Sequence, residues 1–212
     1  MKISYVFIFL GLLALGGLAL FFFNQKSSPQ TAPTQIEVKP TQATIEQFIK
    51  VAPDTSQLKA GGNSYSHPEG SYVFLYPNDY KIDSQNNGIH TRIYKTGATQ
   101  QGQTEIYDGV IMVFESINLK GQNLENFVTS RIKDSTSGDT SRTFSHLKPV
   151  LLNNYTGFVY EEKGFGSSTH LVLQKDTTSG FATEVTFSVN DPQNQNYLNE
   201  VYAILSTVEL LK

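Results

Sequence analysis

The chain has four histidines, whose imidazole side chains titrate near neutral pH and are common metal ligands. His67 stands beside Glu69 in an expected loop, whereas His90, His146 and His170 fall in expected strands. No two of them have the close spacing of a zinc site on one helix or hairpin. His90 and His170 are the pair that a sheet can bring together. We expect surface or edge histidines, with no metal site and no cofactor.

The segment nearest to a catalytic serine motif runs from Gly164 to Ser168 (GFGSS). It lacks the Gly-x-Ser-x-Gly pattern of a nucleophile elbow, and it joins two expected strands instead of leading into a helix. Glu161 and Glu162 are adjacent carboxylates, but neighbouring strand residues point to opposite faces, so they cannot act as one dyad. We expect a non-catalytic protein in which Phe165, at the loop tip, contacts a partner or packs back.

A calcium loop is the other site that acidic residues suggest. Asp134 to Asp139 (DSTSGD) carries acidic and hydroxyl side chains, as the first part of an EF-hand loop does. The twelfth position of such a loop is a bidentate Glu, and this chain has Ser145 there. A bound cation therefore stays an alternative, and no metal ligand is assigned.

Tyrosines gather at positions 72, 76, 80 and 94, early in the expected folded region. Aromatic side chains among polar ones can form a face that binds sugar or peptide. The same alternation fits a buried face opposite a solvated one, and we expect the buried arrangement. A polar loop from Gly97 to Asp108 is long enough to be functional. We take Tyr94, Tyr107 and Phe165 as the candidate partner contacts.

The elements that would position these residues follow from hydrophobic periodicity. Helical spacing predicts one helix from about Asn123 to Asp134 and another that starts at Asp191-Pro192. The buried stripe of the second helix is expected at Tyr197, Leu198, Val201, Tyr202 and Leu205. Strands are expected at 72–76, 80–82, 89–94, 109–117, 143–151, 156–162, 169–175, 181–189 and 207–211.

The order of these elements predicts an α+β fold, in which helices cover a mainly antiparallel sheet. Asn86-Asn87-Gly88 predicts a type I′ hairpin turn in its first part. The first half of the strand at 109–117 is nearly all apolar, which predicts a central strand covered on both faces.

An uncharged apolar run, Ile3 to Phe23, stands between Lys2 and Lys26. At 1.5 Å per residue it makes about 32 Å of helix, close to the thickness of the hydrocarbon core of a bilayer. The run is longer than the apolar part of a secretory signal, and its bulky Phe21-Phe22-Phe23 end does not suit a cleavage site. We expect a single-pass, uncleaved anchor over residues 1–25, with cleavage as the alternative. Positive charge before the run favours a cytoplasmic N-terminus and a folded domain outside.

Residues 26–64 are expected to be a linker, because the stretch up to Pro40 is rich in Pro, Thr, Gln and Ser. Within it, Thr44-Ile45-Glu46-Gln47 matches a capping box and predicts a short helix over 44–52. That helix would dock on the domain or lie near the membrane. One globular domain, 65–212, is then expected.

Composition limits both the classes of partner that the protein can bind and the interactions that can stabilise its fold. The formal net charge is −3 and no basic block occurs, so neither nucleic acid nor anionic lipid is expected as the main partner. The chain has no cysteine, which excludes lipoprotein acylation and disulfides. The hydrophobic core alone must therefore stabilise the fold.

The stretch Ser71-Tyr72-Val73-Phe74-Leu75-Tyr76-Pro77-Asn78-Asp79-Tyr80 resembles the entry element of the PsbP/Mog1-like family, an aromatic-rich strand that ends in Tyr-Pro-x-x-Trp. Tyr80 stands where that family has Trp. The last helix and terminal strand of the family resemble residues 191–211, and the resemblance covers about 65–212. It implies an αβα sandwich. No residue here matches a manganese or chloride motif, so a photosynthetic function does not carry over.

We therefore hypothesise a membrane-tethered, extracytoplasmic and non-catalytic interaction or assembly module with a PsbP-like domain. Its partners would be the lipid bilayer, through residues 3–23, and a protein at the membrane surface. The alternative is a ligand-binding module for cell-wall glycan, a cation or a small molecule, using the loop at 97–108 and the tyrosines. A divergent enzyme is the third hypothesis.

Overall fold

The computed structural model describes residues 44–85, 89–100, 106–164 and 166–212. They belong to a compact unit that runs from Gln42 to Lys212. No helix among the described residues is long and apolar enough to cross a membrane. The anchor expected over residues 1–25 and the hairpin turn expected at 86–88 lie outside the described residues.

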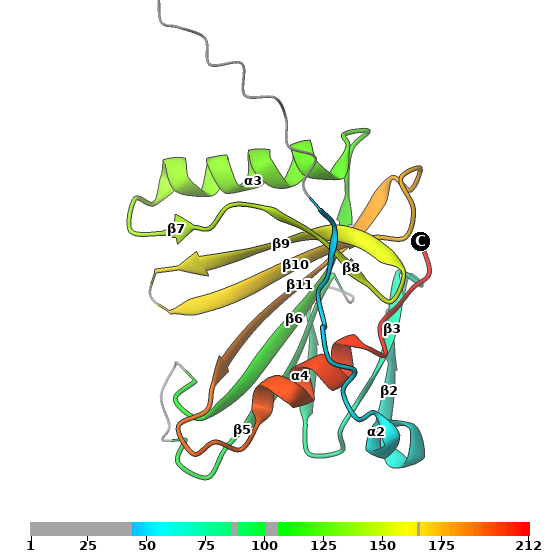
Figure 1. Cartoon of the computed structure of the whole chain (residues 1–212), viewed down its shortest axis with the longest axis vertical. Helices are drawn as coiled ribbons and strands as arrows, with labels where there is room; N and C mark the ends of the chain where they lie inside the picture. The colour runs from blue at the N-terminus through cyan, green and yellow to red at the C-terminus, as the bar shows by residue number, and fades with distance from the viewer. Residues whose placement is uncertain (1–43, 86–88, 101–105, 165) are drawn as a thin grey trace, which may run out of the picture. The chain divides into compact units, whose positions relative to one another are not determined.

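The unit contains both strands and helices, with more residues in strands than in helices, which confirms the predicted α+β class (Figure 1). The elements are β1 (Glu46–Gln47), α2 (Ser56–Gly61), β2 (Asn63–Ser66), β3 (Tyr72–Tyr76), β4 (Lys81–Gln85), β5 (His90–Thr96), β6 (Gly109–Asn118), α3 (Leu124–Gly138), β7 (Thr143–Phe144), β8 (Lys148–Leu152), β9 (Tyr155–Lys163), β10 (Ser167–Gln174), β11 (Phe181–Asn190), α4 (Tyr197–Leu205) and β12 (Glu209–Leu210).

The strands form two sheets. The larger sheet has nine strands, in the order β1-β8-β9-β10-β11-β6-β5-β4, with β7 paired to β9 off this path. Its pairs are antiparallel except for β1 with β8. The smaller sheet has the order β12-β3-β2. The predicted central position of β6 is confirmed, because β6 lies between β5 and β11. The predicted cover on both faces is incomplete, because Ile111 and Val113 are only half-buried.

Aromatic residues of β3 pack the smaller sheet onto the larger one. Alternate positions of β3 are buried, so Tyr72, Phe74 and Tyr76 all point inward. Phe74 stacks on Phe114 of β6 with 4.2 Å between ring centroids, and the Tyr72 hydroxyl donates to Thr91 Oγ1 at 3.1 Å. These residues and α4 form the main core. The buried arrangement expected for the β3 tyrosines is confirmed.

Helix α3 covers the opposite face of the larger sheet. Its Leu124 and Val128 share a second core with Val172 of β10 and Ala182 of β11. On β10, Val172 alternates with residues of the main core, so the two cores lie on opposite faces of the sheet. Figure 1 accordingly shows α3 and α4 well apart, with the strands between them.

The predicted start of α3 is confirmed and its predicted end is wrong. Asn123 caps the helix by accepting a hydrogen bond from the Asn126 N–H at 2.8 Å. The helix then continues past Asp134 to Gly138. Hydroxyls in its last turns donate to carbonyl oxygens one turn back, as Ser135 does to Arg131 at 2.9 Å. The DSTSGD segment is therefore mostly helical and does not form an EF-hand loop.

The prediction of a short helix over 44–52 is wrong. Glu46–Gln47 form β1 on the edge of β8, and the Phe48 N–H donates to the Leu151 carbonyl at 2.9 Å. The sheet edge thus supplies hydrogen bonds that an isolated helical turn would have to make alone. The folded unit also begins before the expected residue 65, because β1 pairs with β8 and Leu58 of α2 lies in the main core. We call residues 46–54 the strap.

Helix α4 starts later than the sequence predicts. It begins at Tyr197, and its N-cap residue, Asn196, makes no side-chain capping hydrogen bond. The predicted cap, Asp191, instead accepts the N–H groups of Gln195 and Asn196 at 2.6 and 2.7 Å and so stabilises the turn before the helix. Leu198, expected in the buried stripe, is 42% exposed.

The strand expected over 143–151 is divided into β7 and β8, which pair with different parts of β9. A two-residue turn joins β8 to β9, and its Asn153 and Asn154 have φ values of 49° and 72°. Positive φ at both positions is the geometry of a type I′ turn, which asparagine tolerates.

Candidate functional site

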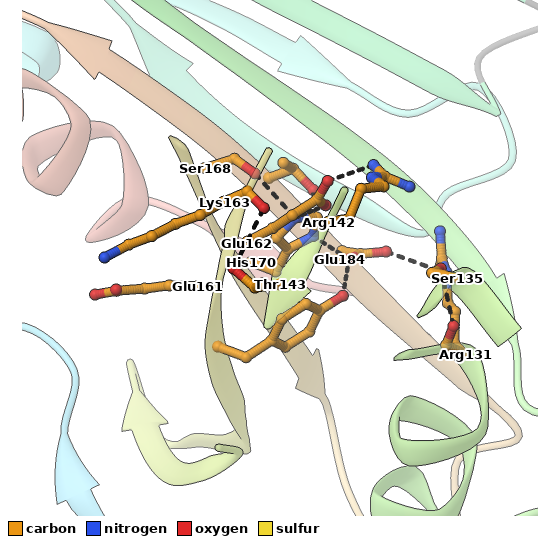
Figure 2. A network of polar contacts seen from close by, with 12 residues as sticks. Arg131, Ser135, Arg142, Thr143, Glu161, Glu162, Lys163, Ser168, His170 and Glu184 are labelled. Atoms are coloured by element: carbon orange, nitrogen blue, oxygen red, sulfur yellow. Dashed lines mark hydrogen bonds and ion pairs between the residues drawn. The ribbon is translucent and has the colours of Figure 1, made fainter. Parts of the chain in front are cut away.

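A network of charged side chains lies on the sheet face beside α3 (Figure 2). His170 of β10 is at its centre, with Nδ1 2.8 Å from Glu184 Oε1 and Nε2 3.1 Å from Glu162 Oε2. The imidazole stacks on the Tyr160 ring with 4.5 Å between centroids and 8° between planes. Two carboxylates and one aromatic face therefore fix the orientation of His170.

Two arginines bring positive charge to the same carboxylates. Arg131 Nη1 of α3 is 2.7 Å from Glu184 Oε2, and Arg131 Nη2 donates to Glu115 Oε2 at 3.2 Å. Arg142, in the segment after α3, pairs with Glu162. The network therefore ties α3 and the segment after it to β6, β9 and β11.

Glu184 is the most buried carboxylate of the network, with 3% of its surface exposed. Burial raises the pKa of Glu184, but the hydrogen bond from His170 and the charge of Arg131 lower it by more, so this pKa lies below its usual 4.5. The Tyr160 hydroxyl donates to the same carboxylate at 3.1 Å, and burial raises the pKa of that phenol. Glu184 is therefore ionised and Tyr160 neutral at pH 7.

Ser168, His170 and Glu184 are arranged like the side chains of a serine hydrolase triad. Ser168 Oγ is 3.1 Å from His170 Nε2, while Glu184 binds the other ring nitrogen. A general base needs a free lone pair on Nε2, and the Glu162 carboxylate faces that nitrogen at 3.1 Å. Ser168 therefore shares Nε2 with a carboxylate, and a second carboxylate lies at the other ring nitrogen. The geometry therefore fits an ion network better than a catalytic triad.

Glu161 and Glu162 point to opposite faces, as the sequence predicts. Glu162 joins the network, whereas Glu161 is exposed and points away from His170 (Figure 2).

We expect Glu184 to make stability depend on acid pH. The folded chain favours the ionised carboxylate, so its stabilisation is present above the unfolded pKa of about 4.5 and is lost as pH falls through the lower folded pKa. In thermal unfolding, the wild-type midpoint should fall more steeply below about pH 4.5 than that of Glu184→Gln, which cannot titrate. Glu161→Gln should follow the wild type. Parallel curves for wild type and Glu184→Gln would contradict this expectation.

A groove of about 950 Å³ opens between the strap, α2 and α4. This volume is at the upper end of the range of small-ligand sites. Phe48 of the strap packs edge-on against Tyr202 of α4, with 6.0 Å between ring centroids. Aliphatic side chains make up much of the remaining wall: Ile49, Val51, Ala52, Pro53, Leu58, Pro77 and Ala203.

Lys95 also lines this groove, and its ammonium group forms ion pairs with two carboxylates. Its Nζ is 2.8 Å from Asp79 Oδ2 and 2.9 Å from Glu200 Oε1. The rings of Tyr80 and Tyr197 lie 5.7 and 5.4 Å from the same ammonium. Burial lowers the pKa of Lys95, but its hydrogen bonds to the two carboxylates raise it to above its usual value. Lys95 is therefore a bound cation and not an amine nucleophile, which would need a lowered pKa.

Amide side chains form the rim of the groove. Gln57 of α2 and Asn196 and Asn199 at the start of α4 are exposed, and their side chains make no hydrogen bond within the part of the chain that the structure describes. Each amide offers both a donor and an acceptor. The groove can therefore bind an uncharged ligand that carries both kinds of group.

The predicted partner contacts lie elsewhere. Tyr94 of β5 is half-buried beneath the Arg92 guanidinium, which is 4.7 Å from its ring centroid. Tyr107, just before β6, is 52% exposed. Neither lines the groove, and Phe165 lies outside the described residues. Contact of these three residues with a partner stays a prediction.

The loop from Gly97 to Asp108 is fixed at its described ends. Asp108 Oδ2 accepts hydrogen bonds from the Thr99 hydroxyl and N–H at 2.7 and 3.0 Å. These hydrogen bonds place the pKa of Asp108 below its usual value.

The histidines do not come together. His90 and His170 are separated by β6 and β11, and His90 Nδ1 is instead 3.9 Å from Glu115. His67 is buried, and its Nδ1 accepts the Glu69 N–H at 3.2 Å. No three His, Asp or Glu side chains of the described residues are arranged to hold a metal ion.

Sequence reasoning missed the groove and most of the network. Lys95 and Glu200 meet across 105 positions of the chain, and no local pattern indicates such a pair. Glu184 had no usable signal, because it shares its face of β11 with Thr186 and Ser188, as a solvent-exposed charge would.

Comparisons with known proteins concern the fold alone. No model of a protein family and no curated protein matches this chain. The chain is similar to the solution structure of cyanobacterial PsbP (CyanoP) from Synechocystis sp. PCC 6803, with 10% identity, a TM-score of 0.45 and coverage of 77% of this chain and 95% of that one. It is also similar to a mutant of the protein Mog1, with 5% identity, a TM-score of 0.45 and coverage of 72% and 97%. Neither likeness carries a site residue or a function to this chain.

Proposed function

We propose that this chain is a non-catalytic interaction module, held outside the cytoplasm by a membrane anchor over residues 1–25, and that its groove binds a protein partner. The groove is the observation that carries the proposal. It combines about 950 Å³ of open volume with amide side chains that have no partner among the described residues. The apolar run Ile3 to Phe23 and the spacer after it support the tether.

Two features support a non-catalytic role. The residues with the geometry of a catalytic serine and base are accompanied by Glu162, which occupies the side of His170 that a base would use. The lysine of the groove is bound to Asp79 and Glu200 and is held as a cation. The contacts of Lys95 stabilise a charge that an amine nucleophile would need to lose.

The tether is tested by fractionating cells that express the full-length chain or a variant without residues 3–23. We expect the full-length chain to stay in the membrane pellet after carbonate washing, and the variant to be released. Protease added outside intact cells should digest the folded unit. Lysine-reactive crosslinking of the same membranes, followed by mass spectrometry, should then identify a protein partner. Release of the full-length chain by carbonate, or protection of the folded unit, would contradict the proposal.

A serine hydrolase is the second candidate, because Ser168 and His170 lie within hydrogen-bonding distance. A fluorophosphonate probe on the full-length chain decides between the two. We expect no labelling of Ser168. Labelling that is lost in Ser168→Ala would favour the hydrolase.

A further inference from the structure

We infer that two copies of this chain pair through β2, so that their smaller sheets join into one continuous antiparallel sheet. This surface goes beyond the proposed function, because no residue of β2 lines the groove. Three properties of β2 suit it to this contact: the direction of its backbone groups, its lack of charge and the symmetry of its sequence.

The backbone of β2 directs hydrogen-bonding groups out of the smaller sheet. β2 pairs with β3 and is the last strand of that sheet (Figure 1). The His67 N–H donates to the Tyr72 carbonyl at 3.0 Å, so these two residues form a hydrogen-bonded pair of the ladder. Bonded and non-bonded pairs alternate along antiparallel strands. Tyr65 therefore bonds to β3, while the backbones of Ser64 and Ser66 point away from it.

The contacts of β3 agree with this direction. Leu75 and Val73, which lie opposite the two serines, direct their own backbones toward β12. The Leu75 N–H donates to Thr207 Oγ1 at 2.9 Å, and the Leu211 N–H donates to the Ser71 carbonyl at 2.9 Å. Both serines of β2 are exposed, and within the part of the chain that the structure describes their outward N–H and carbonyl groups make no hydrogen bond.

β2 carries no charge, unlike the other strands at the ends of the two strand orders. Its residues are Asn, Ser, Tyr and Ser, whereas β4 contains Lys81 and Asp83, β1 contains Glu46 and β12 contains Glu209. Charged residues on an edge strand prevent it from pairing with another chain. Two copies of β2 can therefore approach without like charges opposing each other.

The sequence of β2 is symmetric about Tyr65, because a serine stands on each side of it. A twofold axis at Tyr65 places Ser64 of one copy opposite Ser66 of the second copy. Both serines then form hydrogen-bonded pairs, in which every outward N–H and carbonyl of the two strands has a partner. Tyr65 faces its counterpart in a non-bonded pair, where side chains lie closest and aromatic pairs stabilise a sheet.

A second copy fits this edge better than a flexible peptide does. β2 is short, so it offers few hydrogen bonds to offset the entropy that a peptide loses when it becomes ordered. The second copy brings an edge that is already rigid. The Tyr65 ring lies 5.3 Å from that of Phe74, and its hydroxyl accepts a hydrogen bond from Thr91 at 2.8 Å.

The register is tested with introduced cysteines, because the chain has none of its own. Full-length chains with Ser64→Cys or Ser66→Cys carry different tags, are coexpressed, and are oxidised with copper phenanthroline. Hydrogen-bonded partners lie about 5.5 Å apart at Cα, within disulfide range, whereas identical positions lie on a diagonal of about 7–8 Å. We expect the mixed disulfide to exceed either self-disulfide at least about tenfold.

The backbone hydrogen bonds are tested by comparing Ser64→Pro with Ser64→Ala in the full-length chain. Both variants lose the hydroxyl, but only proline removes the outward N–H, and a strand tolerates proline where its N–H faces solvent. Melting temperatures check that both variants fold. In sedimentation velocity with detergent, the dissociation constant of the dimer should rise at least about tenfold in Ser64→Pro and stay within about twofold in Ser64→Ala.

Three results would overturn the pairing through β2. They are a mixed disulfide no more abundant than chance contact gives, equal self-association of Ser64→Pro and Ser64→Ala, and a disulfide from either cysteine variant to a different protein. Each result would leave the proposed function intact, because the groove is formed by other residues.

Discussion

Replacing Glu184 with alanine should lower the free energy of unfolding by about 3–5 kcal/mol. The substitution leaves Arg131 without its closest carboxylate and His170 and Tyr160 without their acceptor, at a position with 3% of its surface exposed. Removing one partner of a buried ion network costs far more than the network itself contributes, because the remaining charges stay desolvated. Urea denaturation followed by far-ultraviolet circular dichroism measures the change.

Two control variants test whether the destabilisation of Glu184→Ala comes from the unpaired charges and not from a simple loss of packing. Glu161→Ala, on the exposed neighbour of Glu162, should change the free energy of unfolding by less than about 0.5 kcal/mol. A triple variant, Glu184→Leu with Arg131→Met and His170→Leu, removes the charges together and should be more stable than Glu184→Ala. A cost below about 1 kcal/mol for Glu184→Ala would show that the network does not hold α3 to the sheet.

Phe74→Ala should destabilise the folded unit by a similar amount, about 3–5 kcal/mol. The Phe74 side chain is 1% exposed and stacks on Phe114 at 4.2 Å and 13°, where the smaller sheet packs on the larger one. Its loss leaves a cavity that the surrounding strands cannot fill without shifting. Phe181→Ala is the matched control, because that ring is 38% exposed. Its expected cost is at most about 1 kcal/mol, and equal costs for the two would contradict the assigned core.

Elements whose pattern is local could be predicted from the sequence. β3 and β6 could be recognised because their apolar residues alternate in β3 and run together in β6. The alternation of β3 also predicts which of its residues are buried. The start of α3 was recognisable because Asn123 caps it with its own side chain. Such features depend on neighbours in the chain, and the sequence displays those neighbours directly.

Structural features that depend on contacts between residues far apart in the sequence could not be predicted. The capping-box pattern at Thr44 is a local preference, and the edge of β8 outcompetes it by pairing with Glu46–Gln47. The groove combines the strap, α2, the turn after β3 and α4, so no single stretch of sequence reveals it. The predicted contacts Tyr94 and Tyr107 both lie outside this groove.

Site-specific photo-crosslinking in the native membrane tests most directly whether the groove is the binding surface of this module. A p-benzoylphenylalanine is placed in the full-length chain at position 199, in the groove, and separately at positions 94 and 126, outside it. We expect one protein adduct from position 199 that is absent from position 126. Adducts from position 94 alone, or equal adducts from all three positions, would contradict the assignment of the groove as the binding surface.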